Sequence, residues 1–521
     1  MSLSSDQLKK YWDAACKLWK HMDAAEYKHI VLGLVFIKYI SDSFAERRTE
    51  LEASFSNPKS DSYKPDERRR AAALEDRNYY KEVNVFWVPE NARWQSIAES
   101  SKQPEIKKLI DEALFSIEKE NPRLEGILER IYSDSKIPPH VLGEVVDLIG
   151  TINFGDKDSK SSDILGATYE YFLGMFADKE GKRGGQYFTA PSIVKTLVEV
   201  LQPTKGRVYD PACGSGGMFV QSEKFVESHG GVKGNIAIYG QESNPTNRRL
   251  CAMNLAIRGI EFDLGSKAWD TFDEDLHKDK KFDYIMMNPP FGNDASYPKD
   301  KTINDVRWKT FGVPREKPAN YAWMSHAFFH LAPKGRAGIV MARGSLTSSN
   351  KEDLAIRKGF VEAGVVECII DLPSNLFFNT PIPSCIWFFN KDKKQWKNSR
   401  DNEILFIDAR KMGHPISRSQ IEFGQEEISK IAGTFIDWTK GNFTDIPEFA
   451  VSVPESEVLT NRLSLSPGRY LGLTENDEDD VDVDYQERIS GLIQSIKDNF
   501  AESNEIESII LQQIEKLNHG K

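Results

Sequence analysis

A glycine-rich turn decides the fold of this chain. Residues 207–219 are RVYDPACGSGGMF, a short apolar strand followed by a run of small residues. Glycine permits a sharp change of direction and lets a ligand approach the backbone closely. In α/β proteins, ligands bind in the crevice beyond the strand ends. A plain strand-to-helix turn is the alternative, although so many small residues are unusual for one. The stretch predicts an α/β fold with a ligand site that starts at Asp210.

The sequence around this turn has the pattern of a largely parallel sheet. After Gly181, short apolar runs alternate with stretches of helical character, as expected for such a sheet. The candidate strands are Arg207–Tyr209, Ile236–Tyr239, Phe282–Met287, Ala337–Met341, Val365–Ile370 and Ser384–Phe389. The last two are expected to form a terminal hairpin. We therefore predict a Rossmann-like domain over residues 174–400.

The first 173 residues have a different pattern. Apolar residues such as Ile30, Leu34 and Ile37 recur at helical spacing, and no run of alternating strands is present. Residues 57–70 are charged and contain proline, so we expect an exposed loop there. Residues 1–173 are therefore predicted to form a helical N-terminal domain.

The C-terminal part is expected to contribute an extension and docking helices. Residues 401–484 carry one apolar run, Ile404–Ile407, then lose clear periodicity and end in the acidic stretch 475–484, which predicts a solvated linker. Residues 485–521 follow, with apolar residues on one helical face. These residues are Ile489, Leu492, Ile493, Ile496, Phe500, Ile506, Ile509, Ile510, Ile514 and Leu517. Such helices dock either on their own chain or on a partner, and both possibilities stay open.

Composition bounds the class of protein. The chain has 521 residues, of which 40% are hydrophobic, enough for about three domains. No apolar run approaches the roughly 20 residues that span a bilayer. The N-terminus lacks the pattern of a secretory signal, so a cytoplasmic location is expected. Five cysteines without a CxxC pair argue against a disulfide framework and against a zinc site, and no metal is expected.

The net charge restricts how the chain could bind nucleic acid. It has 68 basic and 79 acidic residues, a net charge of -11. This balance is unfavourable for a protein that holds the DNA phosphate backbone alone. Either DNA is not the substrate, or a local basic face or a partner subunit supplies most of the phosphate contacts.

The glycine-rich turn and the next strand end predict a nucleoside-type cofactor. Gly214 and Gly216 begin a GxG pattern, but the third position of a dinucleotide fingerprint is Phe219, so a pyrophosphate ligand is poorly matched. Glu242 follows the next strand, where a carboxylate can accept hydrogen bonds from two ribose hydroxyls. A surface glutamate or a helix cap is the alternative for this residue.

The most specific motif is Asn288-Pro289-Pro290-Phe291, directly after the strand at residues 282–287. An aromatic exocyclic amine is a weak nucleophile because its lone pair is delocalised into the ring. The Asn288 side-chain oxygen and a main-chain carbonyl such as that of Pro289 can hold its two N–H groups and direct the lone pair toward a methyl donor. A base within a duplex must first be flipped out, and Phe291 offers it a stacking face.

The two motifs, in this order, resemble those of gamma-class DNA amino-methyltransferases. The resemblance implies S-adenosyl-L-methionine as the cofactor and adenine N6 as the target. The implied cofactor residues are Asp210, Gly214, Ser215, Gly216, Gly217, Met218, Glu242 and Asp270, with an upstream motif of Gly184, Gly185, Gln186, Tyr187, Phe188 and Thr189. The family usually has Pro directly after this Thr, whereas here Ala190 precedes Pro191. The implied catalytic residues are Asn288, Pro289, Pro290 and Phe291.

Further segments resemble the modification subunit of Type I restriction-modification systems. These are the helical N-terminus, residues 85–89 (VFWVP) with Arg93-Trp94, and residues 465–470 (LSPGRY). The resemblance spans nearly the whole chain. It implies double-stranded DNA as substrate, a specificity subunit that recognises the sequence, a restriction subunit in the full complex and two modification subunits for each specificity subunit. A separate specificity subunit also explains how an acidic catalytic subunit can act on DNA.

Several alternatives remain at this stage. A protein-glutamine N5 methyltransferase would use a similar site, because an amide nitrogen is also planar and deactivated. A cofactor-binding scaffold without activity is another possibility. N4-cytosine transfer would rest on similar chemistry, but Ser is the commoner first motif residue there. Phe377, next to Phe378, is predicted either as a second stacking face for the target base or as a core residue. The lysines between residues 391 and 397 are expected to lie in a solvated loop.

Overall fold

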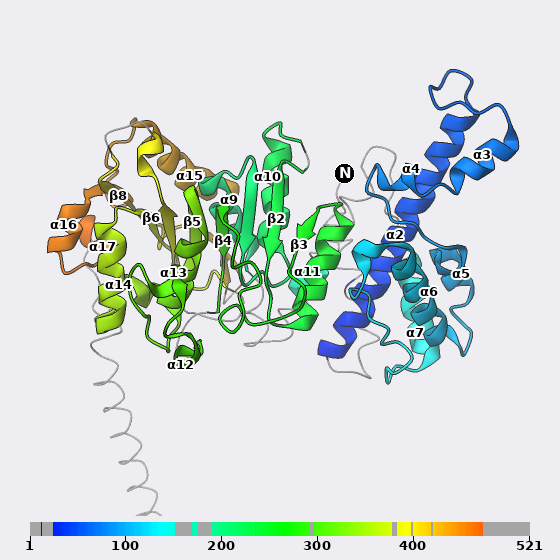
Figure 1. Cartoon of the computed structure of the whole chain (residues 1–521), viewed down its shortest axis with the longest axis horizontal. Helices are drawn as coiled ribbons and strands as arrows, with labels where there is room; N and C mark the ends of the chain where they lie inside the picture. Colours follow the sequence, from blue (N-terminus) through cyan, green and yellow to red (C-terminus); the bar gives the residue numbers. More distant parts are fainter. Residues whose placement is uncertain are drawn as a thin grey trace, which may run out of the picture.

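The chain folds into a helical part and a sheet part that lie side by side (Figure 1). The computed structural model describes residues 12, 24–151, 169, 171–175, 189–232, 234–290, 295–377, 383–396, 400–417 and 420–472. The two segments expected at the C-terminus, residues 475–484 and 485–521, lie outside the described residues.

The N-terminal part is helical, as predicted. It contains α2(Ala24–Ser56), α3(Glu67–Leu74), α4(Asn78–Lys81), α5(Trp94–Glu99), α6(Ile106–Glu120) and α7(Pro139–Gly150). Phe44 of α2 stacks on Tyr80 with ring centroids 4.9 Å apart and meets Trp87 edge-on at 5.1 Å. These buried aromatic contacts join the long helix to the chain that returns along it.

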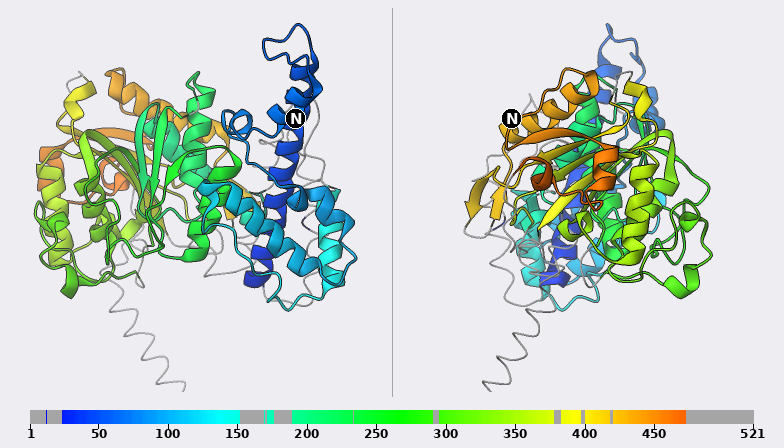
Figure 2. Two further views of the ribbon diagram at one scale, coloured as in Figure 1. Left: turned by 45° about the vertical axis from the view of Figure 1, so that its right-hand side comes forward. Right: turned by 90° about the vertical axis from the view of Figure 1, so that its left-hand side faces the viewer.

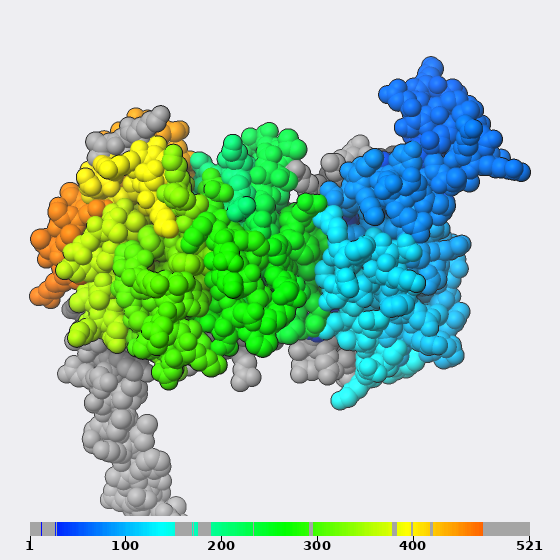
Figure 3. All heavy atoms as spheres, in the orientation of Figure 1, coloured from blue at the N-terminus to red at the C-terminus, as the bar shows by residue number. Residues whose placement is uncertain are grey.

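The exposed loop predicted at residues 57–70 is shorter in the structure. It ends at Asp66, whose carboxylate accepts a hydrogen bond from the Arg69 N–H and caps α3. Residues 67–70 are therefore helical, because an N-cap followed by Glu67 in the first turn favours a helix start despite the local charge. The end of α2 and α3 project away from the rest of the molecule (Figure 3).

A nine-stranded sheet forms the second part. Its strands are β1(Gly206–Asp210), β2(Ile236–Gly240), β3(Phe262–Asp263), β4(Phe282–Met287), β5(Leu331–Ala342), β6(Val366–Asp371), β7(Ser384–Asn390), β8(Glu403–Asp408) and β11(Ala450–Pro454). The order in the sheet is β11-β8-β6-β7-β5-β4-β1-β2-β3. A separate two-stranded sheet pairs β9(His414–Ser417) with β10(Gln420–Glu422).

The directions of the strands show at which edge of the sheet a ligand is expected to bind. β1 pairs in parallel with both β2 and β4, which makes it the point where the chain changes from one half of the sheet to the other. Ligands of open α/β sheets bind at such a switch point, outside the carboxyl ends of the strands. β7 runs antiparallel between β5 and β6.

Helices cover both faces of the sheet. One face packs against α9(Pro191–Leu201), α10(Gly217–Ser228), α11(Pro245–Ile257) and α15(Gln425–Lys440), and the other against α13(Asn320–His330), α14(Lys351–Glu362), α16(Glu455–Thr460) and α17(Pro467–Tyr470). Along β5, Val340 belongs to the first core and its neighbours Ile339 and Met341 to the second. This alternation is the period of a strand buried on both sides. The right-hand view of Figure 2 shows α15 and α14 on opposite sides of the sheet.

All six predicted strands are present, but two expectations about the C-terminal side were wrong. β6 and β7 do form an antiparallel pair, but this pair is internal, because β8 and β11 extend the sheet beyond β6. Residues 401–472 thus complete the sheet, and the boundary expected at residue 400 does not separate two folded units. β11 is a half-exposed edge strand of five residues, too short to show clear periodicity in sequence.

The helical and sheet parts share a continuous core. Residues of α2 and α11 belong to the same apolar cluster. The Tyr39 hydroxyl donates to the Ile257 carbonyl, and Arg249 forms an ion pair with Glu129. Among the described residues, no helix is long and apolar enough to cross a bilayer.

Candidate active site

A cavity of about 640 Å³ lies at the carboxyl ends of β1, β2 and β4. It brings together residues from distant parts of the sequence. Of the predicted site residues, those that line it are Thr189, Asp210, Gly214, Ser215, Gly217, Met218, Glu242, Asp270, Asn288 and Pro290. The cavity therefore joins the predicted cofactor motif to the predicted catalytic motif.

The glycine-rich turn is held in a conformation that requires glycine. Gly214 and Gly216 have positive φ angles of 52° and 82°. A Cβ on Gly216 would lie 2.8 Å from the Cys251 Sγ atom of α11. The Gly216 N–H donates to the Cys213 carbonyl at 2.8 Å, which closes the turn at the start of α10. The turn can therefore bring its backbone against a ligand only with glycine at these positions.

Glu242 connects the end of β2 to this turn. Its Oε2 atom accepts a hydrogen bond from the Gly214 N–H at 2.9 Å, and its Oε1 atom accepts one from the Asn244 N–H at 2.8 Å. The residue is 6% exposed. Burial raises the pKa of Glu242, and the backbone hydrogen bonds partly offset that rise. Each carboxylate oxygen retains a lone pair for a ligand hydroxyl.

Asp210 is the second buried carboxyl group of the cavity. Its Oδ1 atom accepts a hydrogen bond from the Ala212 N–H at 3.0 Å. Burial raises the pKa of Asp210 to about 8; the Ala212 hydrogen bond opposes the shift, and the charge of Glu242 adds to it. Two acidic groups with raised pKa values in one cavity are typical of a functional site.

Asp270 and Thr271 form the wall of the cavity that follows β3. The Asp270 Oδ1 atom accepts hydrogen bonds from the N–H groups of Phe272 at 2.7 Å and Asp273 at 3.2 Å, which fixes the turn. The Thr271 hydroxyl donates to the Pro211 carbonyl at 2.6 Å. This turn is thereby hydrogen-bonded directly to the start of the glycine-rich turn.

Asn288 follows β4 and has one half of its amide fixed. Its Nδ2 atom donates to the Thr189 hydroxyl at 3.0 Å. Its Oδ1 atom is buried and has no hydrogen-bond partner within the part of the chain that the structure describes. A buried acceptor without a protein partner is costly, and because Asn288 lines the cavity its oxygen can accept a hydrogen bond from a ligand. The contact with Thr189 was not apparent in the sequence, because the two residues are 99 positions apart.

The other predicted site residues do not line the cavity or are not described by the structure. Gly184, Gly185, Gln186, Tyr187, Phe188 and Phe291 lie outside the described residues. Gly216 and Pro289 adjoin lining residues without lining the cavity. Phe377 is a core residue with 4% exposure and is not a lining residue. Its predicted stacking on a target base has no support from this position.

Several residues of the cavity wall could not be predicted from the sequence. Tyr171, Lys195, Thr271, Trp323 and Gln420 also line it. Trp323 lies on α13, far along the chain from both motifs, and only the packing of α13 on the sheet brings its ring to the cavity. No local pattern in the sequence distinguishes it from the other buried aromatic residues of that helix.

The geometry now defines a class. A sheet with the central order β3-β2-β1-β4-β5-β7-β6, a glycine-rich turn after β1, a buried carboxyl group after β2 and an Asn-Pro-Pro motif after β4 is the arrangement of a Rossmann-like methyltransferase.

Comparison with known proteins gives the family. The N-6 DNA methylase family matches residues 160–479, and the HsdM N-terminal domain matches residues 9–149. The chain is 42% identical over 447 residues to the Type I restriction enzyme HindI methylase subunit of Haemophilus influenzae, covering 82% of this chain and 99% of that protein. It is 37% identical over 476 residues to the MjaIX methylase subunit of Methanocaldococcus jannaschii, covering 90% and 84%. The chain therefore belongs to the N-6 DNA methylases, among the methylase subunits of Type I restriction enzymes.

A solved structure shares the fold. The type I restriction-modification system methyltransferase subunit from Streptococcus thermophilus superposes with a TM-score of 0.72 at 23% identity, covering 90% of this chain and 99% of that one. The expected fold class, a helical N-terminal part followed by a Rossmann-like methyltransferase domain, is confirmed.

Proposed function

We propose that this chain transfers the methyl group of S-adenosyl-L-methionine to N6 of an adenine flipped out of double-stranded DNA, as the modification subunit of a Type I complex. The half-fixed amide of Asn288 is the observation that supports this most directly. Thr189 holds its nitrogen, and the buried oxygen faces no protein donor among the described residues. One N–H of an exocyclic amine would satisfy that oxygen.

The cavity suits the proposed cofactor. Glu242 would accept hydrogen bonds from the ribose hydroxyls, Asp270 would hold the adenosine end, and the turn from Gly214 to Met218 would admit the ligand against its backbone. The predicted motif from Gly184 to Thr189 would close over the methionine end. S-Adenosyl-L-methionine supplies a methyl group on a sulfonium, which is a good leaving group.

The chain's own residues would orient the target. The Asn288 oxygen and the Pro289 carbonyl would accept the two N–H groups of the amine, which directs its lone pair along the transfer axis. Phe291 would stack on the extruded base, and the aromatic Trp323 lies on the cavity wall. The proton of the methylated amine can leave after transfer, so no strong base is needed among these groups.

We also propose the partners of the assembly. These are double-stranded DNA, a specificity subunit, a restriction subunit in the full complex and a second copy of this chain. Residues 485–521 would dock on the specificity subunit, and the complex would act in the cytoplasm. Residues 1–173 and the sheet part from residue 174 would form the two main units of the chain. The family match favours DNA over protein glutamine as the substrate.

Asn288→Ala tests the proposed chemistry. In the complex with the specificity subunit, we expect cofactor affinity by calorimetry to stay nearly intact and methyl transfer to fall about 10²-fold or more, as when one transition-state hydrogen bond is deleted. If the chain were a scaffold without activity, the substitution would leave both cofactor affinity and assembly of the complex unchanged, and the unaltered complex would show no methyl transfer. Full-rate adenine modification by the variant would refute the mechanism.

Thr189→Val tests the hydrogen bond that orients Asn288. Valine keeps the shape but cannot accept from the Asn288 amide, so we expect kcat to fall about tenfold, with a smaller effect on cofactor KM. Thr196→Val is the matched control, because Thr196 lies on α9, is fully buried and donates only to the Ser192 carbonyl of its own helix. An equal loss of kcat in the control would mean that packing, and not the amide, is responsible.

A further inference from the structure

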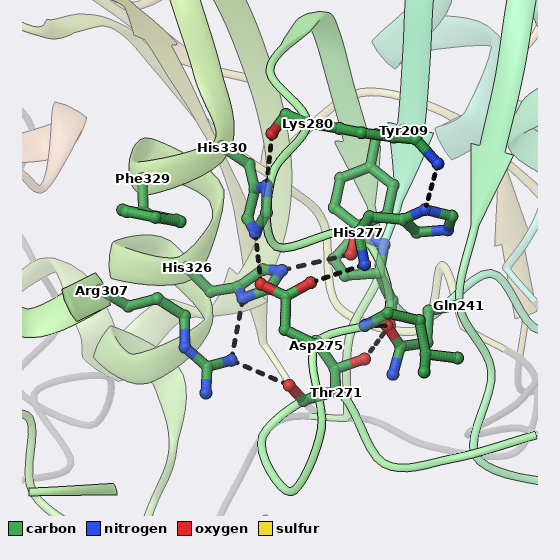
Figure 4. A network of polar contacts seen from close by, with 12 residues as sticks. Tyr209, Gln241, Thr271, Asp275, His277, Lys280, Arg307, His326, Phe329 and His330 are labelled. Atoms are coloured by element: carbon green, nitrogen blue, oxygen red, sulfur yellow. Dashed lines mark hydrogen bonds and ion pairs between the residues drawn. The ribbon is translucent and has the colours of Figure 1, made fainter. Parts of the chain in front are cut away.

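A buried polar cluster lies next to Thr271, a residue that lines the cavity (Figure 4). Its members are Asp275, Arg307, His326 and His330. Asp275 lies between β3 and β4, the two histidines lie on α13, and Arg307 lies on the short helix η5(Val306–Trp308). The proposed chemistry uses none of these residues.

Asp275, His326 and His330 have the composition of a metal site, but their hydrogen bonds argue for another role. The ring nitrogens of His330 lie 2.8 Å from Asp275 Oδ2 and 3.0 Å from the Lys280 carbonyl oxygen. Both ring nitrogens of His330 are therefore already engaged by oxygen atoms of the protein. The third candidate ligand is His326, whose Nδ1 atom lies 3.2 Å from the Arg307 guanidinium. The fixed positive charge of Arg307 at this place disfavours the binding of a metal cation. The cluster is therefore a hydrogen-bond network.

Electrostatics of the network agree with that assignment. Burial alone would raise the pKa of Asp275, but the hydrogen bond from His330 and the two nearby imidazoles hold it well below its usual value. Burial, with the charges of His330 and Arg307, lowers the pKa of His326 well below its usual value. A neutral His326 can accept a hydrogen bond from Arg307 through Nδ1. His326 thus stabilises the guanidinium without placing a second positive charge beside it.

Arg307 reaches from this network to the wall of the cavity. Its Nη1 atom donates to the Thr271 carbonyl at 2.8 Å, and its Nη2 atom donates to the Phe272 carbonyl at 3.3 Å. Asp305 accepts from its Nε and Nη2 atoms at 3.0 and 2.8 Å. The residue is 5% exposed. Its planar fork is thus fixed on one side by Asp305 and holds two consecutive carbonyls of the cofactor-side turn on the other.

Arg307 itself belongs to the segment that follows the catalytic motif. We call residues 295–318 the post-motif segment. The Ala319 N–H donates to the Ala295 carbonyl at 3.0 Å and closes the base of this segment, while the Tyr297 hydroxyl donates to the Pro314 carbonyl at 2.6 Å. The segment is therefore a closed loop, and in the sequence it follows the Asn288 motif. It displays Ile303 and Val306, which are 52% and 50% exposed.

We propose that Arg307 is a positioning residue that couples cofactor binding to binding of the target base, by joining the turn at Thr271 to the post-motif segment. This inference rests on the proposed function. The turn lines the cavity, and the segment follows in the sequence the Asn288 motif, which is proposed to hold the base. A ligand that restricts the motion of the Thr271 turn also restricts the motion of the post-motif segment, because Arg307 is hydrogen-bonded to that turn. Bound cofactor should therefore raise the affinity for DNA. Because such coupling is reciprocal, bound DNA should raise the affinity for the cofactor by the same factor.

The experiment measures this coupling in the complex of the full chain with its specificity subunit. The affinity for duplex DNA carrying 2-aminopurine at the target position is measured with and without saturating S-adenosylhomocysteine, and fluorescence reports the extruded base. The ratio of the two affinities is the coupling factor, and such factors are commonly about 5- to 150-fold. For Arg307→Lys, which keeps the charge but cannot hold both carbonyls, we expect the factor to fall toward one.

Two further variants keep the result interpretable. Arg315→Lys is the matched control, because Arg315 lies in the same post-motif segment but pairs with Asp353 of α14 at 2.8 Å, away from the Thr271 turn. Its coupling factor should stay at that of the unaltered chain. Asp305→Asn loosens the guanidinium from its more exposed side and should lower the factor partially, which provides a readout if Arg307→Lys unfolds in a thermal melt.

The outcomes separate this inference from the proposed function. If the unaltered complex does not methylate adenine, the proposed function fails. If it methylates normally and both Arg307→Lys and Asp305→Asn keep the full coupling factor, the inference alone is wrong. An equal fall in the Arg315→Lys control would also overturn it, because the effect would then belong to the segment as a whole.

Discussion

At the scale of single residues, the buried carboxyl group of Asp210 has a pKa close to neutral pH. It is 2% exposed at the end of β1, and burial raises its pKa to about 8. The carboxyl group is therefore mostly protonated at pH 7. In the cofactor-free protein this shift lowers stability progressively as pH rises from about 4, the pKa of an unfolded aspartate, to about 8.

We predict that cofactor binding releases a proton from Asp210. S-Adenosyl-L-methionine is a cation at its sulfonium, and a nearby positive charge favours the carboxylate. At pH 7, calorimetry in phosphate and in Tris should give binding enthalpies that differ by up to about one proton's ionisation heat. At pH 9.5 the difference should vanish, because Asp210 is then already ionised.

Asp210→Asn distinguishes this residue from Glu242, whose pKa is also raised. The variant should bind without the proton release if Asp210 is the source. Equal enthalpies in both buffers at pH 7 for the unaltered chain would contradict the prediction.

At the scale of elements, the turn between β1 and α10 depends on Gly216. Alanine there would have to adopt a φ of 82° and place its Cβ 2.8 Å from the Cys251 Sγ atom. We expect Gly216→Ala to destabilise the protein by about 2–4 kcal/mol, from backbone strain and overpacking together. Urea unfolding measures this cost.

Gly217→Ala is the control for stability in the same turn. Gly217 is the first residue of α10, its φ is not positive, and nothing lies within 4 Å of an added Cβ. Alanine should therefore leave the free energy of unfolding unchanged or raise it slightly. A cost for Gly217→Ala as large as that for Gly216→Ala would show that the argument from geometry is wrong.

The elements also show how far local sequence patterns extend. The strands near the site were predicted because each is an apolar run that ends at a polar or glycine-rich motif, as in Phe282–Met287 before Asn288. The position of β7 between β5 and β6 could not be predicted, because strand order depends on contacts between residues far apart in sequence. β11 was missed for a local reason, because a half-exposed edge strand of five residues shows no clear periodicity.

At the scale of the whole molecule, the net charge of -11 bears on DNA binding. We predict that the purified chain alone binds duplex DNA weakly and without sequence preference, with a Kd in the micromolar range or weaker that rises steeply between 50 and 200 mM salt, as for non-specific binding. Addition of the specificity subunit should give tight binding to its site and methylation.

Gel shifts with a cognate duplex and a scrambled one measure this division of labour. A truncation after Asp484 gives the control for docking through the last residues of the chain. Nanomolar site-specific binding by the chain alone would refute the prediction, and normal assembly of the truncated chain would refute docking through residues 485–521.

The sequence by itself determined the two motifs, the class of sheet and the helical N-terminal part, because strand-turn-helix units and helical periodicity are local properties. Only the tertiary structure decided that Thr189 fixes Asn288, that Trp323 lines the cavity and that Arg307 holds the Thr271 turn. Each of these contacts joins residues that are far apart along the chain or on separate elements. Their partners are chosen by the packing of helices on the sheet, which no local pattern encodes.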